Sequence, residues 1–484
     1  GAVLVTKDKA FLWTDGRYFL QAEKELKGSG ILLQKSGEPN VPTVFEYLAQ
    51  TLPAGSTIGM DGKVMALNSF AQFNSSLPDM KFVIDRDLIG EMWTDRPAPV
   101  LSAAFLLDVR YTGKPASEKI KEVRAALREK KAEATVIGAL EDVCYLFNIR
   151  GNDIACTPVV TAYALVDMQS ARLYIDARQM TDEVKAALEK EGVSVAPYEA
   201  VFADAEKLQG TVYLDPTRTN IFLRNKIKAD IIEGLNITSS MKAVKNETEI
   251  KNYRNAFLKD GIAMVKILKW VEDHADSGVT EWDVSEQLLR FRAEQPDFIE
   301  ASFTTIAGYG ANAAIIHYGP KKNTAATLQP KGFLLLDSGG QYKDGTTDIT
   351  RTIPLGPLTA EEKEDYTLVL KGHIQLALAK FPENTTGYKL DILARNPLRK
   401  YGKDYKHGTG HGVGYVLSVH EGPQNIGLRY TDAPMKAGMI TSNEPGLYRP
   451  GKWGIRIENL LVTRKVKNPE ETQFGSYLCM EPIT

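Results

Sequence analysis

Cysteine is scarce in this chain of 484 residues. Its three cysteines, Cys144, Cys156 and Cys479, are odd in number and scattered. They cannot form a regular disulfide framework, so we expect them to be reduced, buried and small-hydrophobic in character. Because thiols stay reduced inside cells, this pattern favours a cytoplasmic location.

Net charge is also nearly absent, since the formal charge is only −2. Such a balance provides no basic surface of the kind that binds nucleic acid. No run approaches the roughly 20 apolar residues that a membrane-spanning helix needs. We therefore expect neither nucleic acid nor a membrane among the partners.

Two aspartates flank a glycine-rich turn in the last third of the chain. The apolar run 333–336 suits a buried strand and ends at Asp337. A hairpin symmetric about Tyr342 and Lys343 would place Asp337 opposite Asp348. Two acids so close repel and titrate together unless a positive group lies between them, and a metal ion would meet that need. The alternative is a hairpin whose acids face solvent.

Three further motifs follow. The segment HGTGHGVGYVLSVH holds three of the six histidines, and its alternate glycines exclude a helix, so His407 and His411 are not paired on one helical face. Glu444 directly precedes a proline, which keeps it extended. In WGIRIEN, alternation places Arg456 and Glu458 on one strand face.

These motifs together supply four carboxylates and one imidazole. The candidate metal ligands are Asp337, Asp348, His411, Glu444 and Glu458. Four negative charges balance two divalent cations, whereas burying uncompensated carboxylates is costly. Two ions roughly 3.5–4 Å apart can share carboxylates and a bridging water. Oxygen-rich ligation suits Mn²⁺, although Co²⁺ or Zn²⁺ would also bind.

In the contexts LLLDSGGQY, GTTDITRT, HGTGHGVG, TSNEPGLY and IRIENLL, these ligands resemble the pita-bread metallopeptidases. The resemblance is greatest to the three-domain Xaa-Pro aminopeptidases (aminopeptidase P) and covers essentially the whole chain. It implies that Asp337 binds one metal, that Asp348 and Glu458 bridge, and that His411 and Glu444 hold the other. The implied reaction is attack by a metal-bridging hydroxide on the bond between an N-terminal residue and a following proline.

The resemblance also assigns four further site residues. His317 in AIIHYGP and His420 in SVHEGP would supply hydrogen-bond donors and proton relays around the tetrahedral intermediate. His407 would line the prolyl side of the pocket. Arg456 is expected to hold a ligand carboxylate in place.

Several other conspicuous residues receive a structural interpretation. Arg150 is expected to serve the fold rather than the substrate. Tyr318 and Tyr415 either wall the pocket or simply pack. His274, at the end of a helix, and His373, in a second helix, are expected to lie outside the site.

The first half of the chain contains a quiet internal duplication. FLWTDGR is echoed by LYIDAR, and TIGMD by TVYLD at a comparable distance downstream. Each unit alternates strand and helix, which predicts a small α/β domain with a mixed sheet. In each copy the aspartate (Asp15, Asp176) is expected to turn the strand and to pair with the nearby arginine (Arg17, Arg178).

Length alone predicts about three domains at roughly 150 residues each. We place two small creatinase-like α/β domains at 1–109 and 110–241, followed by a pita-bread catalytic domain at 242–484. The resemblance implies that the family's first domain begins before Gly1 and that its last strand continues past Thr484.

The last domain is expected to open with a long amphipathic helix over residues 247–274, because apolar positions recur there at helical intervals. Those positions are Ile250, Tyr253, Phe257, Ile262, Val265 and Leu268.

Three rival functions stay open at this point. A prolidase that cleaves only Xaa-Pro dipeptides and a methionine aminopeptidase both share the five ligands. In a different class, some pita-bread domains bind peptides or histones without metal, and creatinase uses the same cleft without metal. The preferred partners are peptides with proline in the second position, and the resemblance implies a homodimer.

Overall fold

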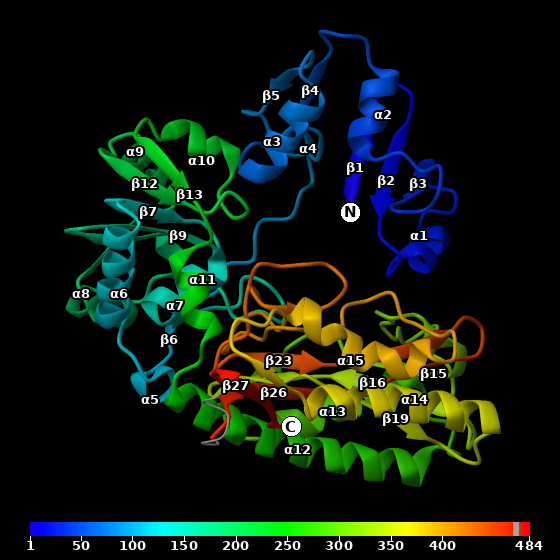
Figure 1. The fold of residues 1–484 in the computed structure, drawn as a ribbon. Helices are drawn as coiled ribbons and strands as arrows, with labels where there is room; N and C mark the ends of the chain where they lie inside the picture. The colour runs from blue at the N-terminus through cyan, green and yellow to red at the C-terminus, as the bar shows by residue number, and fades with distance from the viewer. Residues whose placement is uncertain (468–473) are drawn as a thin grey trace. The chain divides into compact units, whose positions relative to one another are not determined.

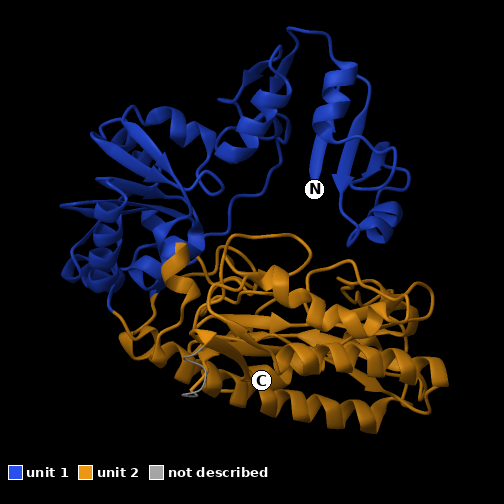
Figure 2. Cartoon of the chain, in the orientation of Figure 1, with its two compact units in different colours: residues 1–105, 115–149, 160–238 blue, residues 106–114, 150–159, 239–484 orange. Residues whose placement is uncertain are grey.

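The computed structural model describes residues 1–467 and 474–484, and the chain divides into two compact units (Figures 1 and 2). Unit 1 comprises residues 1–105, 115–149 and 160–238, and unit 2 comprises residues 106–114, 150–159 and 239–484. Among the helices in the described ranges, none combines the length and the apolar character that crossing a membrane requires.

The first part of unit 1 holds a three-stranded and a two-stranded sheet. In the first sheet, β1 (Ala2–Val5) pairs antiparallel with β2 (Ala10–Thr14), which pairs parallel with β3 (Ile31–Lys35). In the second, β4 (Thr57–Gly59) pairs parallel with β5 (Lys81–Val83). The helices here are α1 (Phe19–Glu25), α2 (Val44–Thr51), α3 (Leu67–Ser76) and α4 (Leu88–Met92).

The rest of unit 1 is built on a mixed six-stranded sheet in the order β11-β10-β9-β7-β12-β13. Its strands are β7 (Ala134–Ile137), β9 (Ala162–Asp167), β10 (Ala171–Ile175), β11 (Val193–Pro197), β12 (Thr211–Leu214) and β13 (Asp230–Glu233). Its helices are α6 (Ala116–Glu129), α7 (Leu140–Phe147), α8 (Asp182–Lys190), α9 (Ala200–Ala205) and α10 (Ile221–Lys226).

The predicted duplication is visible in both parts of unit 1. β10 pairs parallel with β11 as β2 does with β3, and β12 pairs parallel with β13 as β4 does with β5. Each copy keeps its ion pair, at 2.8 Å between Arg17 and Asp15 and 2.6 Å between Arg178 and Asp176. The predicted pairing of these aspartates with the nearby arginines is therefore confirmed.

Among its described residues, unit 2 combines four longer helices with antiparallel sheets (Figure 1). The helices are α12 (Glu247–His274), α13 (Glu281–Ala293), α14 (Ala360–Ala377) and α15 (Gly387–Arg399). One sheet runs β15 (Ile306–Tyr309), β16 (Phe333–Ser338), β19 (Ile349–Pro354); another runs β20 (Lys380–Pro382), β27 (Tyr477–Pro482), β26 (Asn459–Lys465), β23 (Ile440–Asn443). Shorter strands are β14 (Phe298–Ala301), β17 (Gly340–Tyr342), β18 (Gly345–Thr346), β21 (Gly410–His411), β22 (Asn425–Ile426), β24 (Gly446–Arg449) and β25 (Trp453–Arg456).

Strand β16 separates the helical core from the side that carries the acidic residues. Leu334 and Leu336 pack into a cluster formed with α12 and α13. Phe333 packs instead with residues of α14 and β25, and Leu335 joins a third cluster. Since successive strand residues face opposite sides, Asp337 points to the side of Phe333 and Leu335, away from α12.

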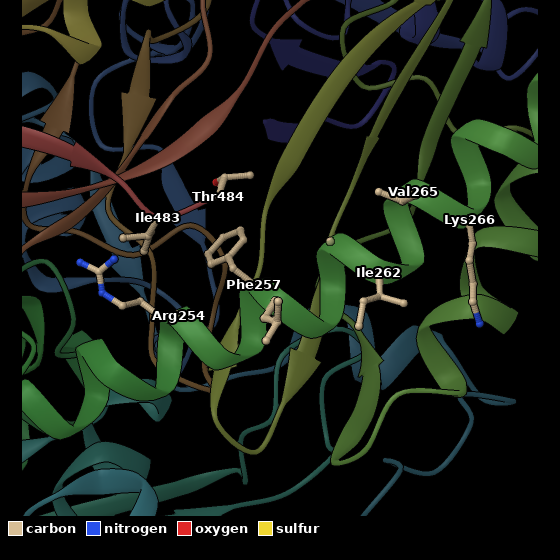
Figure 3. Close-up of a pocket in the computed structure, with 9 residues that line it drawn as sticks. Arg254, Phe257, Ile262, Val265, Lys266, Ile483 and Thr484 are labelled. Carbon is tan, nitrogen blue, oxygen red and sulfur yellow. The ribbon is translucent and has the colours of Figure 1, made fainter.

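Helix α12 spans the predicted residues, and its buried face runs from Ile250 through Phe257 to Val271, but two of the predicted positions lie off that face. Ile262 and Val265 are 44 % and 68 % exposed, so their predicted place on the buried face is wrong. Ala263, Met264 and Ile267 are buried in their place, because β16 and α13 pack there. The exposed face and the chain end Ile483–Thr484 line an open hollow of about 640 Å³ (Figure 3).

The cysteines are free thiols, as expected, but only Cys144 is buried. Cys156 and Cys479 are half-buried, so the expectation of burial is wrong for both. Composition indicates that cysteine favours burial in general, whereas the packing around each position decides it.

Candidate metal centre

The hairpin that carries Asp337 and Asp348 turns one position later than predicted. Strand β16 pairs with β19 so that Asp337 lies opposite Thr350. The turn is centred on Lys343 and Asp344, and Asp348 lies in the link between β18 and β19. The expectation that the two aspartates face each other directly is therefore wrong, because the glycine-rich turn left the register open.

Asp337 is held by a buried arginine. Arg456, only 2 % exposed, donates from Nε and Nη2 to Oδ2 of Asp337 at 3.1 and 2.5 Å. Its Nη1 donates to the Tyr448 hydroxyl at 2.7 Å. The second oxygen, Oδ1 of Asp337, is buried without a hydrogen-bond partner among the described residues. One oxygen is thus neutralised, and the other remains available as a ligand.

Asp348, His411 and Glu458 form the tightest group of donors. Each offers one ligand atom, and these atoms lie within 4.8 Å of one another. Nε2 of His411 is 3.5 Å from Oδ2 of Asp348. Thr350 donates to Oε2 of Glu458 at 2.7 Å, whereas Oε1 of Glu458 is buried without a partner in the described part of the chain.

Glu444, which directly follows strand β23, completes the cluster. Its Oε1 lies 3.3 Å from Nε2 of His411. Ser442 joins the two residues, because its hydroxyl donates to Oε1 of Glu444 at 3.2 Å and accepts from the His411 N–H at 2.9 Å. A Cβ on Gly410 would lie 1.9 Å from the Ser442 carbonyl oxygen, so only glycine permits this approach of the two chains.

The local electrostatics show that the cluster lacks enough positive charge to balance its acids. Burial raises the pKa of Asp348, Glu444 and Glu458 well above the ordinary range, and the charges of neighbouring acids raise it further. Burial lowers the pKa of His411 to about 4, so its ring is neutral at pH 7. Since Nδ1 of His411 lies 3.0 Å from the Gly412 carbonyl oxygen, Nδ1 carries the proton and Nε2 keeps its lone pair.

This donor set fits two divalent cations. Buried carboxylate oxygens without donors cost free energy unless positive charge reaches them, and a neutral imidazole with a free lone pair is the usual metal ligand. Cations in the cluster would keep all four carboxylates ionised. The tertiary structure thus brings together the five residues that the sequence singled out.

The three remaining histidines of the prediction lie around this cluster. Nε2 of His407 is 2.8 Å from the Tyr448 hydroxyl, and burial lowers the pKa of His407 to about 3. The rings of His420 and His411 meet edge to face, with centroids 4.2 Å apart. His317, half-buried after β15, is close enough to contribute to the lowered pKa of His407.

Arg150 and Tyr415 support the glycine-rich segment. Arg150, 1 % exposed, donates from Nε to the Val416 carbonyl oxygen at 2.5 Å and from Nη2 to that of Tyr415 at 2.9 Å. The Tyr415 hydroxyl donates to the Tyr111 carbonyl oxygen at 2.9 Å. These contacts agree with a structural interpretation of both residues.

The sequence did not indicate three polar side chains that contact residues of the site: Thr350, Ser442 and Tyr448. Thr350 and Ser442 each lie two residues from a ligand, Asp348 and Glu444, so period-two alternation could have found them. Tyr448 lies on a different strand from the residues it contacts, and no local pattern indicates it.

His373 lies in the interior beside this centre. It is 6 % exposed, and its Nδ1 is 3.0 Å from the Asn443 carbonyl oxygen. In return, the Asn443 side chain donates to the His373 carbonyl oxygen at 2.8 Å. His373 is therefore a packing residue that links α14 to the strand directly before Glu444.

Family comparisons divide the chain in the expected order. Residues 1–90 match a Creatinase/Prolidase N-terminal domain, and residues 95–249 match a second such domain. Residues 251–465 match Metallopeptidase family M24. The predicted fold class, creatinase-like domains followed by a pita-bread catalytic domain, is confirmed.

Similar proteins cover the whole chain. A probable Xaa-Pro aminopeptidase P of Sordaria macrospora is 42 % identical over 100 % of this chain and 82 % of its own. The X-prolyl aminopeptidase of Caenorhabditis elegans, described as a cytosolic enzyme with a di-nuclear active site, is 37 % identical, with a TM-score of 0.94 over 100 % of this chain and 80 % of its own. An Xaa-Pro dipeptidase of Bacillus anthracis is 25 % identical, with a TM-score of 0.60 over 76 % of this chain and 97 % of its own. The chain is therefore an enzyme of metallopeptidase family M24 and belongs to its Xaa-Pro aminopeptidase P group.

Proposed function

We propose that this chain removes the first residue from peptides whose second residue is proline. The observation that carries the proposal is the convergence of Asp337, Asp348, His411, Glu444 and Glu458 on one cluster of buried and half-buried side chains. The relatives named for Xaa-Pro aminopeptidase activity support the same substrate class. A proline substrate lacks the amide hydrogen that general peptidases use, so a dedicated pocket is needed.

In this proposal the cluster would hold two divalent cations. Asp337 would serve the first, Asp348 and Glu458 would serve both, and His411 and Glu444 would serve the second. Manganese is the preferred ion on ligand hardness, with cobalt or zinc as alternatives. When bound, such a pair supplies an activated water and polarises the scissile carbonyl.

The protein's own groups then fix the ligands. Arg456 holds one oxygen of Asp337 and leaves the other for the cation. Thr350 orients Glu458 in the same way, and Ser442 orients Glu444. Outer contacts of this kind determine ligand geometry and are worth 10- to 100-fold in metal affinity.

The histidines around the cluster handle protons and the proline ring. His317 and His420 are proposed to donate to the developing oxyanion and to relay a proton to the leaving nitrogen. His407, neutral because burial lowers its pKa to about 3, is proposed to line the prolyl side together with Tyr448. The substrate's free amine would lie against the acidic cluster.

The remaining expectations belong to the same proposal. Cytoplasmic location is supported by the free cysteines and by the description of the C. elegans relative as cytosolic. The domain boundaries at 109/110 and 241/242 and a homodimeric state stay predictions.

The experiment compares wild type with Asp348→Ala after loading with Mn²⁺. We expect about two Mn²⁺ ions per wild-type chain and release of the first residue from an Xaa-Pro-Xaa tripeptide. The variant should lose metal and activity while it keeps the fold of unit 1. Asp276→Asn, at an exposed position, is the matched control. Metal-free wild type that binds the peptide without cleavage would instead support a binding protein.

A prolidase is the rival within the enzymes. Wild type should cleave the tripeptide Xaa-Pro-Xaa at least as efficiently as the dipeptide Xaa-Pro. Cleavage of the dipeptide alone would reassign the chain to that activity.

A further inference from the structure

One of the buried carboxylates outside the acidic cluster accepts hydrogen bonds from an irregular segment of unit 2. Glu281, the first residue of α13, is 0 % exposed. Within the described residues its hydrogen-bond donors are all uncharged, and they occupy both of its oxygens. A buried carboxylate is costly, and several donors in fixed geometry are needed to offset that cost. Such an arrangement makes the carboxylate a rigid anchor for whatever donates to it.

The donors to Glu281 come from one segment of chain. Oε1 accepts from the Tyr309 N–H at 2.6 Å and from the Asn312 amide at 3.0 Å. Oε2 accepts from the Tyr318 hydroxyl at 2.7 Å and from the Ala326 N–H at 2.8 Å. The donors span residues 309 to 326, and His317 lies inside that span.

The enclosed segment has little regular structure of its own. A short 3₁₀ turn, Gly310–Ala314, is followed by irregular chain as far as Ala326. No strand ladder therefore fixes the direction of His317 here. A few specific hydrogen bonds decide the backbone path. Glu281 accepts five of them, from Tyr309, Asn312, Tyr318 and Ala326.

Tyr318 connects this anchor to the acidic cluster. It directly follows His317, and its ring packs against the cluster of Ile306, Ala313 and Leu335. Leu335 lies on the same face of β16 as Asp337. Burial and the neighbouring Glu281 charge raise the pKa of Tyr318, so its hydroxyl remains a donor at neutral pH. A shift of this ring would move His317 with it.

We propose that Glu281 and Tyr318 are positioning residues that hold His317 in its orientation for peptide-bond hydrolysis. This inference rests on the proposed function, because it assigns the pair to the same reaction. Neither residue is expected to touch the substrate. Glu281 fixes the two ends of the segment, and the Tyr318 hydroxyl fixes its middle beside the histidine.

The first test is kinetic and uses Mn²⁺-loaded enzyme with the Xaa-Pro-Xaa tripeptide. Tyr318→Phe removes one hydroxyl and keeps the ring. We expect kcat to fall about tenfold with KM changed less than about twofold, because misplacement of a proton donor affects the transition state more than substrate binding. Tyr388→Phe, at an exposed tyrosine, should match wild type.

A double-mutant cycle identifies the residue through which Tyr318 acts. In a His317→Ala background, Tyr318→Phe should cost nothing further, since the group that it positions is gone. A tenfold loss that persists in that background would overturn the proposal, because Tyr318 would then act elsewhere. If Tyr318→Phe acted only by weakening the fold, its loss of kcat would also persist in the His317→Ala background, and the proposal would be overturned.

The second test does not depend on activity. The measurement is the ¹⁵N resonance of the His317 ring, which is assigned by its absence in His317→Ala. This resonance should shift in Tyr318→Phe and in Glu281→Gln. In Glu281→Gln the new amide N–H group faces the N–H and O–H donors that Glu281 accepts from, so those hydrogen bonds are lost. Glu286→Gln on the same helix is the control and should leave the resonance in place. An unmoved His317 resonance in both variants would overturn the inference. Wild type that binds metal but does not cleave the tripeptide would refute the proposed function. The His317 resonance would still decide whether Glu281 and Tyr318 position that histidine.

Discussion

At the scale of single residues, the centre depends on how two of its carboxylates, Asp337 and Glu458, use their two oxygens. Asp337 gives Oδ2 to Arg456 and leaves Oδ1 without a partner among the described residues. Glu458 gives Oε2 to Thr350 and likewise leaves Oε1 unpaired there. The neighbours thus orient one oxygen and leave the other without a hydrogen-bond donor, which is what a metal ligand requires.

Thr350→Val tests this division at one hydroxyl. The substitution keeps the shape of the side chain but removes the donor to Glu458 Oε2. We expect metal affinity to fall about 10- to 100-fold with little change in the fold. Titration with Mn²⁺ monitored by calorimetry measures the change. Thr367→Val, on an exposed turn of α14, is the control, and equal affinities for the two variants would contradict the role of Thr350.

The raised carboxyl pKa values predict how the metal-free protein responds to pH. Asp348, Glu444 and Glu458 keep protons in the folded state that they lose on unfolding, so the stability they contribute is complete below their ordinary pKa and is lost as pH rises. Burial lowers the pKa of His411 to about 4 and that of His407 to about 3, so their opposite effect is confined below about pH 6.5.

We therefore expect the unfolding temperature of chelator-treated protein to fall as the pH rises from about 6.5 to 8.5. Added Mn²⁺ should remove the fall, because cations replace the protons. Scanning calorimetry at several pH values provides the measurement. A metal-free unfolding temperature that rises over this range would contradict the burial of these acids.

At the scale of elements, strand β16 separates stability from chemistry by its alternation. Leu334 and Leu336 face α12 and α13, whereas Asp337 faces the acidic cluster. The ligand is therefore presented by a strand whose other face is anchored in a core. The outer face of α12, by contrast, leaves Val265 exposed.

Leu336→Ala should consequently destabilise unit 2 by about 2–5 kcal/mol, because it opens a cavity between β16 and α12. Val265 lies on the outer face of α12 and is 68 % exposed, so the free energy of unfolding of Val265→Ala should stay within about 0.5 kcal/mol of wild type. Urea unfolding of the metal-loaded variants compares the two. Similar losses for both would mean that the two faces of α12 are not as different as the packing indicates.

At the scale of the whole molecule, the two units should respond differently to metal. All five proposed ligands lie in unit 2, and unit 1 carries only the duplicated α/β folds. A ligand stabilises the unit that binds it, by about 2.7 kcal/mol when its concentration is one hundred times the dissociation constant.

Calorimetry should therefore show a transition that Mn²⁺ raises and chelator lowers, and a second transition that neither changes. Asp348→Ala is the control, since its metal-sensitive transition should stay at the chelated position. A single transition that shifts as a whole would show that the units unfold together. Two transitions that both ignore metal would contradict the metal centre.

The amino-acid sequence alone predicted several features of the fold and of the site. Glycine spacing around His407 and His411 excluded a helix, and the alternation near Glu458 predicted strand faces, because both depend on neighbours in sequence. The internal repeat and the span of α12 are local in the same sense, so they too followed from the sequence.

Tertiary structure decided what depends on contacts between distant segments. The hairpin register shifted by one turn position, since several registers suit a glycine-rich loop. Arg456 donates hydrogen bonds to Asp337, which lies 119 residues away in the sequence. The His373 ring lies against the Asn443 carbonyl oxygen, which lies 70 residues away. The sequence determined which groups could bind metal, because donor chemistry belongs to each residue. Only the packed chain determined which oxygen of Asp337 and of Glu458 stays unpaired among the described residues, because that depends on which neighbour arrives from elsewhere in the fold.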